Sequence, residues 1–277
     1  MPKAVLVTGA SSGIGRAVAG ELVRRGFTVF GTIRRRDDAA ALAALGATPV
    51  TLDVTDAATI AAARAQLEHA LAGQPLAGLV NNAGIPAAGP LELLPLDELR
   101  RVFEVNVVGV VAVTQAFLPL LKAARGRIVN ISSLAGRAAL PFLGPYAASK
   151  FALEAISDSL RRELWPFGIE VIVIEPGNIQ SKIWDKVEAM DLTRYRGTPY
   201  EAVLARFRDR ALRDGRAAPP ADLVARAVRR ALTARRPPTR IVVSAHPWLE
   251  RLAVGLPDRW LDRLMRWTVW GTTGKRY

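Results

Sequence analysis

Short apolar runs alternate with longer amphipathic stretches along most of this chain, and the alternation predicts strands that are each followed by a helix. The predicted strands span residues 4–7, 28–33, 48–52, 78–80, 127–131, 170–174 and 241–243. The predicted helices span residues 14–25, 39–45, 59–71, 96–122, 145–165 and 221–233. Runs such as AVLV and IEVIVI lack polar alternation, which is typical of parallel strands covered by helices on both faces. The pattern therefore predicts a single α/β domain with a doubly wound parallel sheet of about seven strands.

Two segments depart from this rhythm. Residues 182–220 form a polar, Arg-rich stretch with scattered aromatic side chains, which we expect to be a substrate-loop insertion over the carboxyl ends of the strands. The expected domain covers residues 1–244, and residues 245–277 form a basic, Trp-rich C-terminal extension. We favour packing of this extension on the protein's own body or on a second subunit. The alternative is peripheral contact with a membrane surface, because Trp and Arg recur there near a helical period.

The composition excludes several classes of protein. Half of the 277 residues are hydrophobic and 23% are charged, as in folded globular proteins. The absence of cysteine and the presence of only two histidines disfavour a disulfide framework, a metal site and a Ser-His-Asp triad, so we expect no metal.

Charge and the chain start bear on partners and location. The net charge of +13 would suit nucleic acid, but no helix-turn-helix pattern, zinc motif or RNP-like string occurs, so no nucleic-acid partner is expected. The lack of cysteine and of a long apolar signal run predicts a cytoplasmic protein, peripheral to the inner membrane surface if the extension meets lipid.

A glycine-rich turn, TGASSGIG, joins the first predicted strand to the first predicted helix. The first glycine permits a tight turn, the second lets a pyrophosphate approach the backbone, and the third allows close packing of helix on strand. The helix presents free N–H groups and a positive dipole end to an anion. We therefore expect a dinucleotide at this turn, held by Gly9, Ser11, Ser12, Gly13, Ile14 and Gly15.

The string YAASK places Tyr146 and Lys150 four residues apart on a predicted helix, so that both side chains share one face. This pair has a chemical use, because reduction of a carbonyl by hydride requires a proton for the developing alkoxide. A phenol, with an ordinary pKa of about 10, can exchange that proton when a nearby ammonium favours its phenolate form. Taken alone, the spacing is also that of an ordinary amphipathic helix.

Five sequence features occur in a fixed order along the chain. They are TGASSGIG, NNAG at residues 81–84, Asn106 in FEVNVVG, Ser133 in VNISSLAG, and YAASK. Together they resemble the classical short-chain dehydrogenase/reductase family over residues 3 to about 244, and the extension resembles that of the retinoid- and hydroxysteroid-type members. The resemblance implies a Rossmann-type fold, a nicotinamide cofactor, and interconversion of an alcohol and a carbonyl by hydride transfer.

The resemblance assigns roles to four catalytic residues. Tyr146 would act as general acid and base, and Lys150 would favour its phenolate and grip the ribose of the nicotinamide nucleotide. Ser133, thirteen residues before Tyr146, would bind the substrate oxygen, with Ser132 the weaker candidate. Asn106 would hold a water molecule that links Lys150 to solvent.

The resemblance also indicates the remaining cofactor-binding residues. Beyond the glycine turn they are Arg34, Arg35, Asp53, Val54, Asn82, Ala83, Gly84, Tyr146, Lys150, Pro176, Gly177 and Ile179. Ile33 stands where NAD-binding members carry an acid and Arg34 follows it, so we expect NADP to be preferred over NAD. Asp37 and Asp38 nearby keep NAD open. The threonine usual after the PG turn is absent, and we expect Ser181 to stand in for its hydroxyl.

Several apolar side chains flank the catalytic residues in sequence. They are Leu140, Phe142, Leu143, Trp184 and Met190. They predict an apolar pocket for an aliphatic, steroid-like or retinoid-like alcohol or ketone, with internal packing as the open alternative. The combined expectation is an NADP(H)-dependent oxidoreductase that forms a homodimer or homotetramer. The alternative function is a non-catalytic dinucleotide-sensing or scaffold protein of the same fold, although such proteins typically lack the Tyr or the Lys.

Overall fold

The structure, a computed structural model, describes residues 3–270 of the chain. Within this range the side chains of Lys186, Leu264, Trp267, Thr268 and Trp270 are not described. The last seven residues of the predicted C-terminal extension, 271–277, lie outside the described residues.

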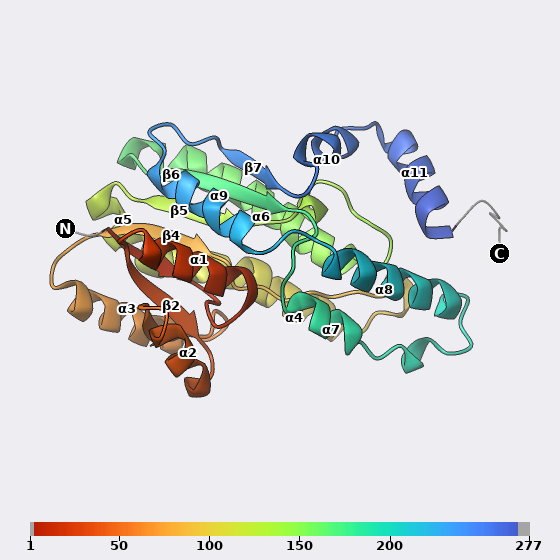
Figure 1. Cartoon of the computed structure of the whole chain (residues 1–277), viewed down its shortest axis with the longest axis horizontal. Coiled ribbons are helices and arrows are strands. Elements are labelled where there is room, and N and C mark those ends of the chain that lie inside the picture. Colours follow the sequence, from red (N-terminus) through yellow and green to blue (C-terminus); the bar gives the residue numbers. More distant parts are fainter. Residues whose placement is uncertain (1–2, 271–277) are drawn as a thin grey trace.

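A single sheet of seven parallel strands forms the centre of the described chain, in the order β3-β2-β1-β4-β5-β6-β7 (Figure 1). The strands are β1 (Ala4–Val7), β2 (Thr28–Ile33), β3 (Thr48–Thr51), β4 (Leu76–Asn81), β5 (Arg127–Ile131), β6 (Glu170–Pro176) and β7 (Arg240–Val243). The chain runs outward from β1 to one edge, returns to β4, and runs to the other edge. This reversal is the doubly wound Rossmann arrangement, which confirms the predicted fold class.

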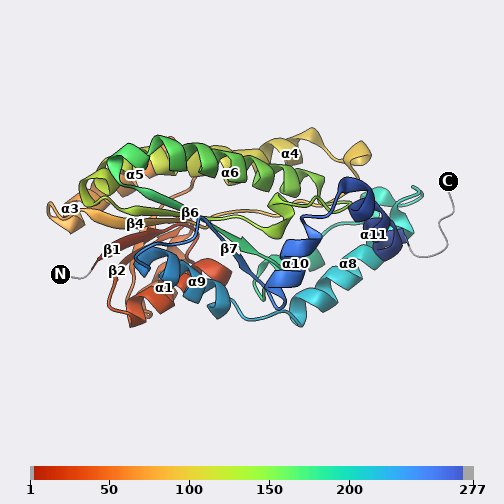
Figure 2. The same cartoon turned by 90° about the horizontal axis from the view of Figure 1, so that it is seen from above.

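Helices cover both faces of the sheet, as Figure 2 shows. One face carries α1 (Gly13–Arg24), α2 (Ala39–Ala43) and α9 (Asp222–Thr233). The other face carries α3 (Ala57–Leu71), α5 (Gly109–Ala124) and α6 (Gly144–Glu163). The two layers account for the apolar runs in the sequence, because a strand between two helical layers has no polar face.

The packing of β1 illustrates this point. Val5 and Val7 belong to the core beneath α1 and α9, whereas Leu6 between them belongs to the core beneath α3 and α5. All three side chains are completely buried. Burying an aliphatic side chain of this size contributes about 1.5–3 kcal/mol, so both layers are held to the sheet by each central strand.

The predicted helix over residues 96–122 consists of three pieces. It begins as α4 (Leu96–Phe103), passes through a π-helical turn (Glu104–Val108), and continues as α5. By length and composition this segment could cross a membrane. Val113 and Phe117 of α5 are nevertheless completely buried against the sheet, so it is a core helix, as the sequence predicts.

Residues 182–220 fold into α7 (Ile183–Glu188), a short 3-10 turn (Thr193–Tyr195) and α8 (Glu201–Arg216). They carry a small apolar cluster of their own, in which Tyr195, Val203 and Leu204 pack with Phe142. The described part of the chain ends in α10 (Pro247–Ala253) and α11 (Asp258–Trp270) (Figure 1). Val269 of α11 packs on the same cluster.

Candidate active site

The glycine turn between β1 and α1 adopts backbone conformations that side chains disfavour. Gly9 and Gly13 have φ values of +63° and +55°. A Cβ atom at Gly15 would collide with the carbonyl oxygen of Gly9 and the side-chain amide of Asn82. Only glycine therefore fits all three positions without rearrangement.

The N-terminus of α1 is open to an anion. Ser12 stands at the N-cap, its side chain makes no capping hydrogen bond within the described chain, and the first turn carries no acidic residue. The orphan N–H groups and the positive end of the helix dipole thus remain available. These are the properties of a phosphate-binding helix N-terminus.

The NNAG segment after β4 is bonded directly to the glycine turn. The side-chain amide of Asn82 donates to the carbonyl oxygens of Thr8 (2.9 Å) and Gly9 (3.2 Å). In return the hydroxyl oxygen of Thr8 accepts from the backbone N–H groups of Asn82 (2.9 Å) and Ala83 (3.0 Å). These four bonds fix two loops, 74 residues apart, as one side of a cleft.

The first asparagine of the same segment stabilises the sheet from inside. Asn81, at the end of β4, donates through Nδ2 to Asn130 Oδ1 of β5 (2.9 Å) and to Thr114 Oγ1 of α5 (3.0 Å). Asn130 donates in turn to Ser157 of α6 (2.9 Å). The buried chain of amides and hydroxyls links the central strands to the two helices that carry the catalytic candidates.

A cleft of about 770 Å³ opens at the carboxyl ends of the strands. Most of the predicted cofactor residues line it, namely Gly9, Ser11, Ser12, Gly13, Ile14, Arg34, Arg35, Asp53, Val54, Asn82, Ala83 and Gly84. The remaining predicted residues, Gly15, Tyr146, Lys150, Pro176, Gly177 and Ile179, are not among its lining residues. Its position, volume and open helix N-terminus fit a dinucleotide.

At one end of the cleft, two arginines follow β2. Arg35 makes a 3.4 Å ion pair with Asp38, whereas Arg34 lines both this cleft and a second hollow beside it that also contains Arg100 and Arg101. No acidic side chain occupies position 33 at the tip of the strand, where Ile33 is buried. This end of the cleft therefore presents cationic groups.

Asp53, after β3, lines the cleft and closes a turn. Its carboxylate accepts from the backbone N–H (3.0 Å) and the hydroxyl (2.8 Å) of Thr55. The hydrogen bonds from Thr55, and the charge of Arg34, hold the pKa of Asp53 below its usual value. The residue is thus an ionised member of the cleft wall and a structural turn residue at once.

Tyr146 and Lys150 lie one turn apart near the start of α6. The Lys150 side chain is buried, its Nζ donates to the carbonyl oxygen of Ile131 at the end of β5 (2.8 Å), and it lies 5.7 Å from the centroid of the Tyr146 ring. Burial lowers the pKa of Lys150 to about 8, against an opposing effect of Glu154. The structure thus brings the predicted pair together.

Of the two adjacent serines, Ser133 is the one that meets the tyrosine. Burial raises the pKa of Tyr146, and a hydrogen bond between its side chain and that of Ser133 acts in the opposite direction. Ser133 Oγ also accepts from the backbone N–H of Ala135 (3.1 Å), which orients the hydroxyl. Ser132 Oγ is buried and has no hydrogen-bond partner within residues 3–270.

Asn106 sits in the π-helical turn and is completely buried. Its Oδ1 accepts from the backbone N–H of Ile85 (2.9 Å), and its Nδ2 donates to the Ile85 carbonyl (3.0 Å) and to Ser149 Oγ (3.0 Å). Ser149 Oγ donates to the carbonyl oxygen of Tyr146 (2.7 Å). The side chain of Asn106 therefore ties the loop after NNAG to the helix that carries Tyr146, and π turns often mark such functional positions.

The segment that begins with the PG turn after β6 lies partly in the core and partly at the cleft. Gly177 N–H donates to the Val243 carbonyl of β7 (2.9 Å), and the Ile179 side chain is buried in the core. Ser181 reaches the cleft and lies 3.4 Å from the place that a Cβ atom of Gly13 would take. Ser181 is therefore placed where the sequence predicts a hydroxyl.

Two side chains expected to line an apolar pocket pack internally instead. Phe142 is buried and stands edge-on to Phe207 of α8, with ring centroids 5.6 Å apart. The Trp184 indole lies against Gly215 of α8, and its Nε1 donates to the Ile179 carbonyl (2.8 Å). For these two residues the alternative of internal packing holds.

Comparison with known proteins agrees with this geometry. The family model for short chain dehydrogenases matches residues 3–192. The chain belongs to the short-chain dehydrogenase family. It resembles the retinoid-handling members in particular, since it is 44% identical over 191 residues to human "Retinol dehydrogenase 16", across 66% of this chain and 59% of the human protein.

Two other proteins are similar to this short-chain dehydrogenase over nearly its whole length. It is 37% identical over 269 residues to the "NADPH-dependent 3-dehydrocapnine reductase" of Ornithobacterium rhinotracheale, across 94% of both chains. A short-chain dehydrogenase of Streptomyces avermitilis, known from its crystal structure, superposes with a TM-score of 0.78 at 31% identity, covering 100% and 99% of the two chains. The chain is an NAD(P)-dependent oxidoreductase that acts on an alcohol/carbonyl pair.

Sequence reasoning missed part of the short-chain dehydrogenase site. The missed lining residues of the cleft are Thr32, Asp38, Leu52, Ile85, Val105, Lys182, Ile183 and Asp185. Thr32 also accepts from Gly9 N–H (3.0 Å), and its position at the end of the second predicted strand could have indicated this contact. Ser149 lies within YAASK and could have been noted there. The sequence predicts that residues 182–220 cover the carboxyl ends of the strands, but it does not indicate that Lys182, Ile183 and Asp185 line the cleft.

Proposed function

We propose that this protein is an NADP(H)-dependent reductase that interconverts a carbonyl and an alcohol on an apolar substrate, with Tyr146 as general acid and base. The observation that carries the proposal is that the buried Lys150 Nζ lies 5.7 Å from the centroid of the Tyr146 ring, one turn further along α6, while Ser133 on the loop after β5 acts on the pKa of the same phenol. A phenol, a hydroxyl and an ammonium gathered beyond the carboxyl end of β5, at the edge of the sheet where the cleft opens, suit proton exchange with a substrate oxygen.

The proposed roles follow from the chemistry of each group. When bound, NADPH supplies the hydride. Ser133 binds and orients the carbonyl oxygen of the substrate, and Tyr146 donates the proton that this oxygen needs on reduction. Because burial raises the pKa of Tyr146, the phenol is protonated near neutral pH, which is the state that a proton donor requires. Lys150 provides the positive charge that stabilises the phenolate left behind.

The remaining contacts position these groups and the cofactor. Asn106 holds the helix of Tyr146 through Ser149 and provides backbone in a π turn where a water molecule can relay protons to Lys150. Gly177 and Ile179 offer backbone groups to the nicotinamide end, and the open N-terminus of α1 receives the pyrophosphate.

NADP is the proposed cofactor for two reasons. Arg34 and Arg35 line the end of the cleft after β2, and no acid stands at the tip of that strand. A guanidinium binds a phosphate through two parallel hydrogen bonds, which favours a 2′-phosphate over a 2′-hydroxyl. The relative that matches over 94% of this chain is named as NADPH-dependent, in support of this choice.

An apolar substrate is supported by exposed leucines near the start of α6. Leu91, Leu93 and Leu96 are 66%, 39% and 63% exposed. The Leu91 side chain approaches Gly144, two residues before Tyr146, to within 2.9 Å of where a Cβ atom would lie. An exposed leucine that contacts the helix turn of a reactive residue suits an apolar ligand. The similarity to a retinol dehydrogenase points the same way.

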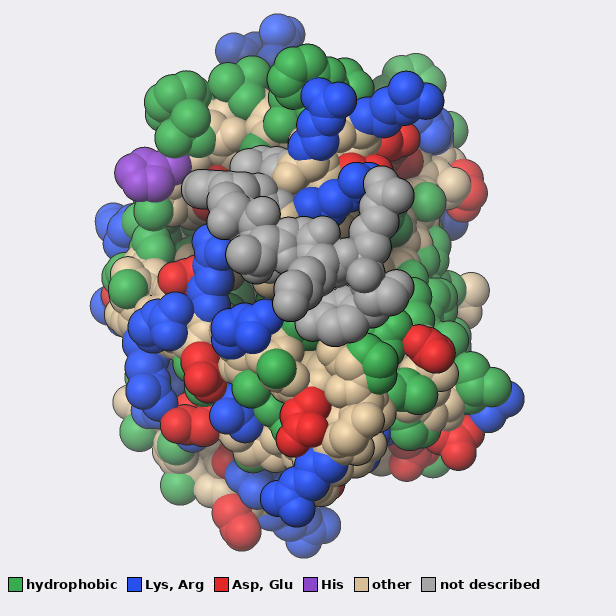
Figure 3. Space-filling model, turned by 90° about the vertical axis from the view of Figure 1, so that its right-hand side faces the viewer, with side chains coloured by type: hydrophobic (Ala, Val, Ile, Leu, Met, Phe, Trp, Pro, Cys, Tyr) green, Lys and Arg blue, Asp and Glu red, His purple; other side chains and the backbone are tan. Residues whose placement is uncertain are grey.

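Assembly and location complete the proposal. We infer a cytoplasmic homodimer or homotetramer, and an interface between subunits is supported by Val108, a large apolar side chain that stays exposed just before α5. The C-terminal helices expose Trp248 (65%), Leu252 (65%) and Trp260 (62%). Figure 3 shows hydrophobic side chains intermingled with Lys and Arg on this side of the molecule. This mixture suits peripheral contact with an anionic membrane surface.

The proposal is tested by NADPH absorbance with a panel of carbonyl substrates. We expect turnover with aliphatic, steroid-like or retinoid-like ketones or aldehydes, and a higher kcat/KM with NADPH than with NADH. Activity confined to sugars or small polar carbonyls would contradict the apolar substrate, and a preference for NADH would contradict the cofactor assignment.

A further inference from the structure

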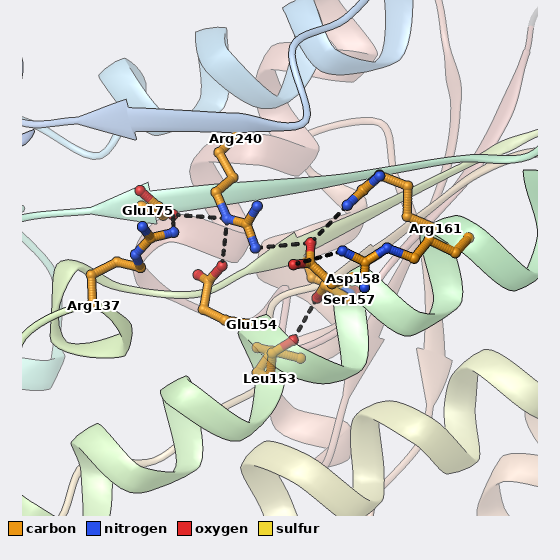
Figure 4. Close-up of polar contacts among 10 residues, drawn as sticks. Arg137, Leu153, Glu154, Ser157, Asp158, Arg161, Glu175 and Arg240 are labelled. Atoms are coloured by element: carbon orange, nitrogen blue, oxygen red, sulfur yellow. Dashed lines mark hydrogen bonds and ion pairs between the residues drawn. The ribbon is translucent and has the colours of Figure 1, made fainter.

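A cluster of ion pairs lies between α6 and the strands β6 and β7 (Figure 4). The same helix carries Tyr146 and Lys150. Its centre is Arg240 of β7, whose Nε is 3.0 Å from Glu154 Oε2 and 3.4 Å from Glu175 Oε1. The terminal nitrogen of Arg240 donates to Asp158 Oδ1 (2.9 Å). Glu154 and Glu175 are almost completely buried, so these are not ordinary surface pairs.

The cluster touches the proposed catalytic machinery through Glu154. Glu154 follows Lys150 by one turn of α6, and both side chains are buried on the same face of the helix. Gly136 packs against both residues, since a Cβ atom there would lie 3.1 Å from the Lys150 carbonyl and 3.2 Å from Glu154 Cγ. Because the protein interior screens charges poorly, any change in the charge of Glu154 alters the electrostatic energy of the Lys150 ammonium.

Only one oxygen of Glu154 is used by the cluster. Oε2 is held by Arg240, whereas Oε1 is buried and has no hydrogen-bond partner among the described residues. A buried carboxylate oxygen without a partner costs stability, so its retention calls for a role beyond joining α6 to β7.

Asp158 offers an internal comparison. It lies one further turn along α6, accepts from the same arginine, and is also paired with Arg161 (3.0 Å). If the cluster only fastened the helix to the sheet, Glu154 and Asp158 would be equivalent. They differ in burial and in partners, since Asp158 is only half-buried and has Arg161 as well, and they differ in position, since only Glu154 is adjacent to Lys150.

On the proposed function of this site, we propose that Glu154 is a positioning residue that keeps the Lys150 side chain charged and directed toward Tyr146. Arg240 holds the carboxylate in place, and Arg137 on the loop after Ser133 approaches Glu175 (3.8 Å) and completes the charge balance. The direction of the electrostatic effects agrees, because burial lowers the pKa of Lys150 and Glu154 opposes this.

The other charges that face these groups must be considered together. Glu175 on β6 has its pKa raised by burial and by Glu154, while Arg137, Arg240 and Arg251 act against this rise. Tyr146 is the titratable group on the other side of Lys150. The effect of Glu154 on Lys150 is therefore measured best at the lysine itself.

The test is an NMR titration of the lysine side chains in the full chain bearing isotope-labelled lysine. The protein has six lysines, and the signal that disappears in Lys150→Arg identifies Lys150. In Glu154→Gln, which can still bond Arg240, we expect the midpoint of the Lys150 titration to fall by about one pH unit. Glu154→Asp should restore most of it. Asp158→Asn, the matched control, should leave it unchanged.

The opposite results would overturn the inference. An unchanged Lys150 midpoint in Glu154→Gln, or equal shifts in Glu154→Gln and Asp158→Asn, would show that the cluster is structural only. If Glu154→Gln does not yield folded protein, Glu154→Met, which fills the space without a charge, serves for the same comparison. This titration needs no substrate, so it stands or falls separately from the proposed function.

A second readout connects the cluster to turnover. With an apolar ketone and NADPH, the alkaline limb of the pH profile of kcat should move to lower pH in Glu154→Gln and stay in place in Asp158→Asn. A profile that moves in neither variant while the Lys150 midpoint moves would contradict the link between this lysine and the reaction. Absence of turnover in the unaltered protein would contradict the proposed function alone.

Discussion

The two ends of the molecule are formed by different kinds of residues and contacts. The end that receives the dinucleotide consists of glycines, short polar side chains and backbone groups, with the glycine turn and NNAG joined by four hydrogen bonds. The other end, formed by α7, α8, α10 and α11, is held by an apolar cluster around Phe142 and Tyr195 and exposes several large hydrophobic side chains. The residues of the first end must fit a ligand of fixed shape, whereas those of the second end can differ according to the substrate.

This difference predicts how each end responds to substitution. At the dinucleotide end, a single added atom should weaken cofactor binding, because backbone and ligand approach closely. At the far end, comparable changes should alter substrate or surface binding and leave the cofactor site intact. The following experiments, ordered by expected effect, sharpen or break this contrast.

Apart from the substitution of Tyr146, the largest effect is expected at Lys150. Lys150→Met should lower kcat by about 10²-fold or more, since the proposed phenolate loses its stabilising charge. The same variant should raise the free energy of unfolding at pH 7 by about 2–3 kcal/mol, because the folded pKa of about 8 lies below that of an exposed lysine.

The gain in the free energy of unfolding of Lys150→Met should depend on pH in one direction. The cost of burying the charged lysine is fully present below about pH 8 and is relieved as the pH rises toward the ordinary lysine value. Denaturant unfolding at several pH values should therefore show a stability gap between Lys150→Met and the unaltered protein that narrows above pH 8. A gap that widens there would contradict the assignment.

The next effect is expected at the glycine turn. Gly15→Ala should weaken NADPH binding about 100-fold, because its Cβ collides with Gly9 and Asn82 and forces the two loops apart. Gly20→Ala in the same helix is the control, since its Cβ meets only side-chain atoms at 3.4 Å or more and should stabilise α1 by about 0.5–1 kcal/mol. Fluorescence titration with NADPH separates the two, and equal affinities would refute close approach at Gly15.

A smaller effect should distinguish the two nicotinamide cofactors. Arg34→Ala should lower kcat/KM for NADPH by about 10- to 100-fold and change that for NADH little, because it removes a charge-assisted bond to the 2′-phosphate. Arg36, which is exposed and not part of the cleft wall, provides the control variant Arg36→Ala. The cofactor assignment is wrong if both variants lose NADPH and NADH activity in parallel.

The smallest effect on catalysis is expected at the C-terminal helices. Replacing Trp248 and Trp260 together by Ala should change kcat/KM for a water-soluble ketone less than about twofold, since both side chains are largely exposed. Co-sedimentation with anionic vesicles should fall markedly. Unaltered sedimentation would remove the membrane proposal and leave packing on a second subunit as the use of these side chains.

The same contrast explains what the sequence could predict. The strands were found from uninterrupted apolar runs, and β1, β2 and β5 have the predicted bounds, because burial on both faces leaves a clear pattern. The cofactor turn was found because its glycines are required by backbone geometry. The pairing of Ser133 with Tyr146 was expected from the resemblance to the family, whose catalytic serine Ser133 matches.

Other features of the structure could not be predicted from the sequence. The π turn at Glu104–Val108 interrupts the predicted helix, and its own five residues include no Pro or Gly. The ion-pair cluster joins Arg240 to Glu154 across 86 residues, and charged side chains give no indication of such partners. Trp184 was expected at a pocket and packs on Gly215, because apolar composition does not say which surface covers it.

The account depends most directly on Tyr146. The decisive measurement is the rate of NADPH oxidation by Tyr146→Phe with the best apolar ketone, together with its affinity for NADPH. We expect kcat to fall by about 10³-fold while the dissociation constant for NADPH changes less than about threefold, because only the proton donor is removed. Turnover near that of the unaltered protein would contradict the central claim.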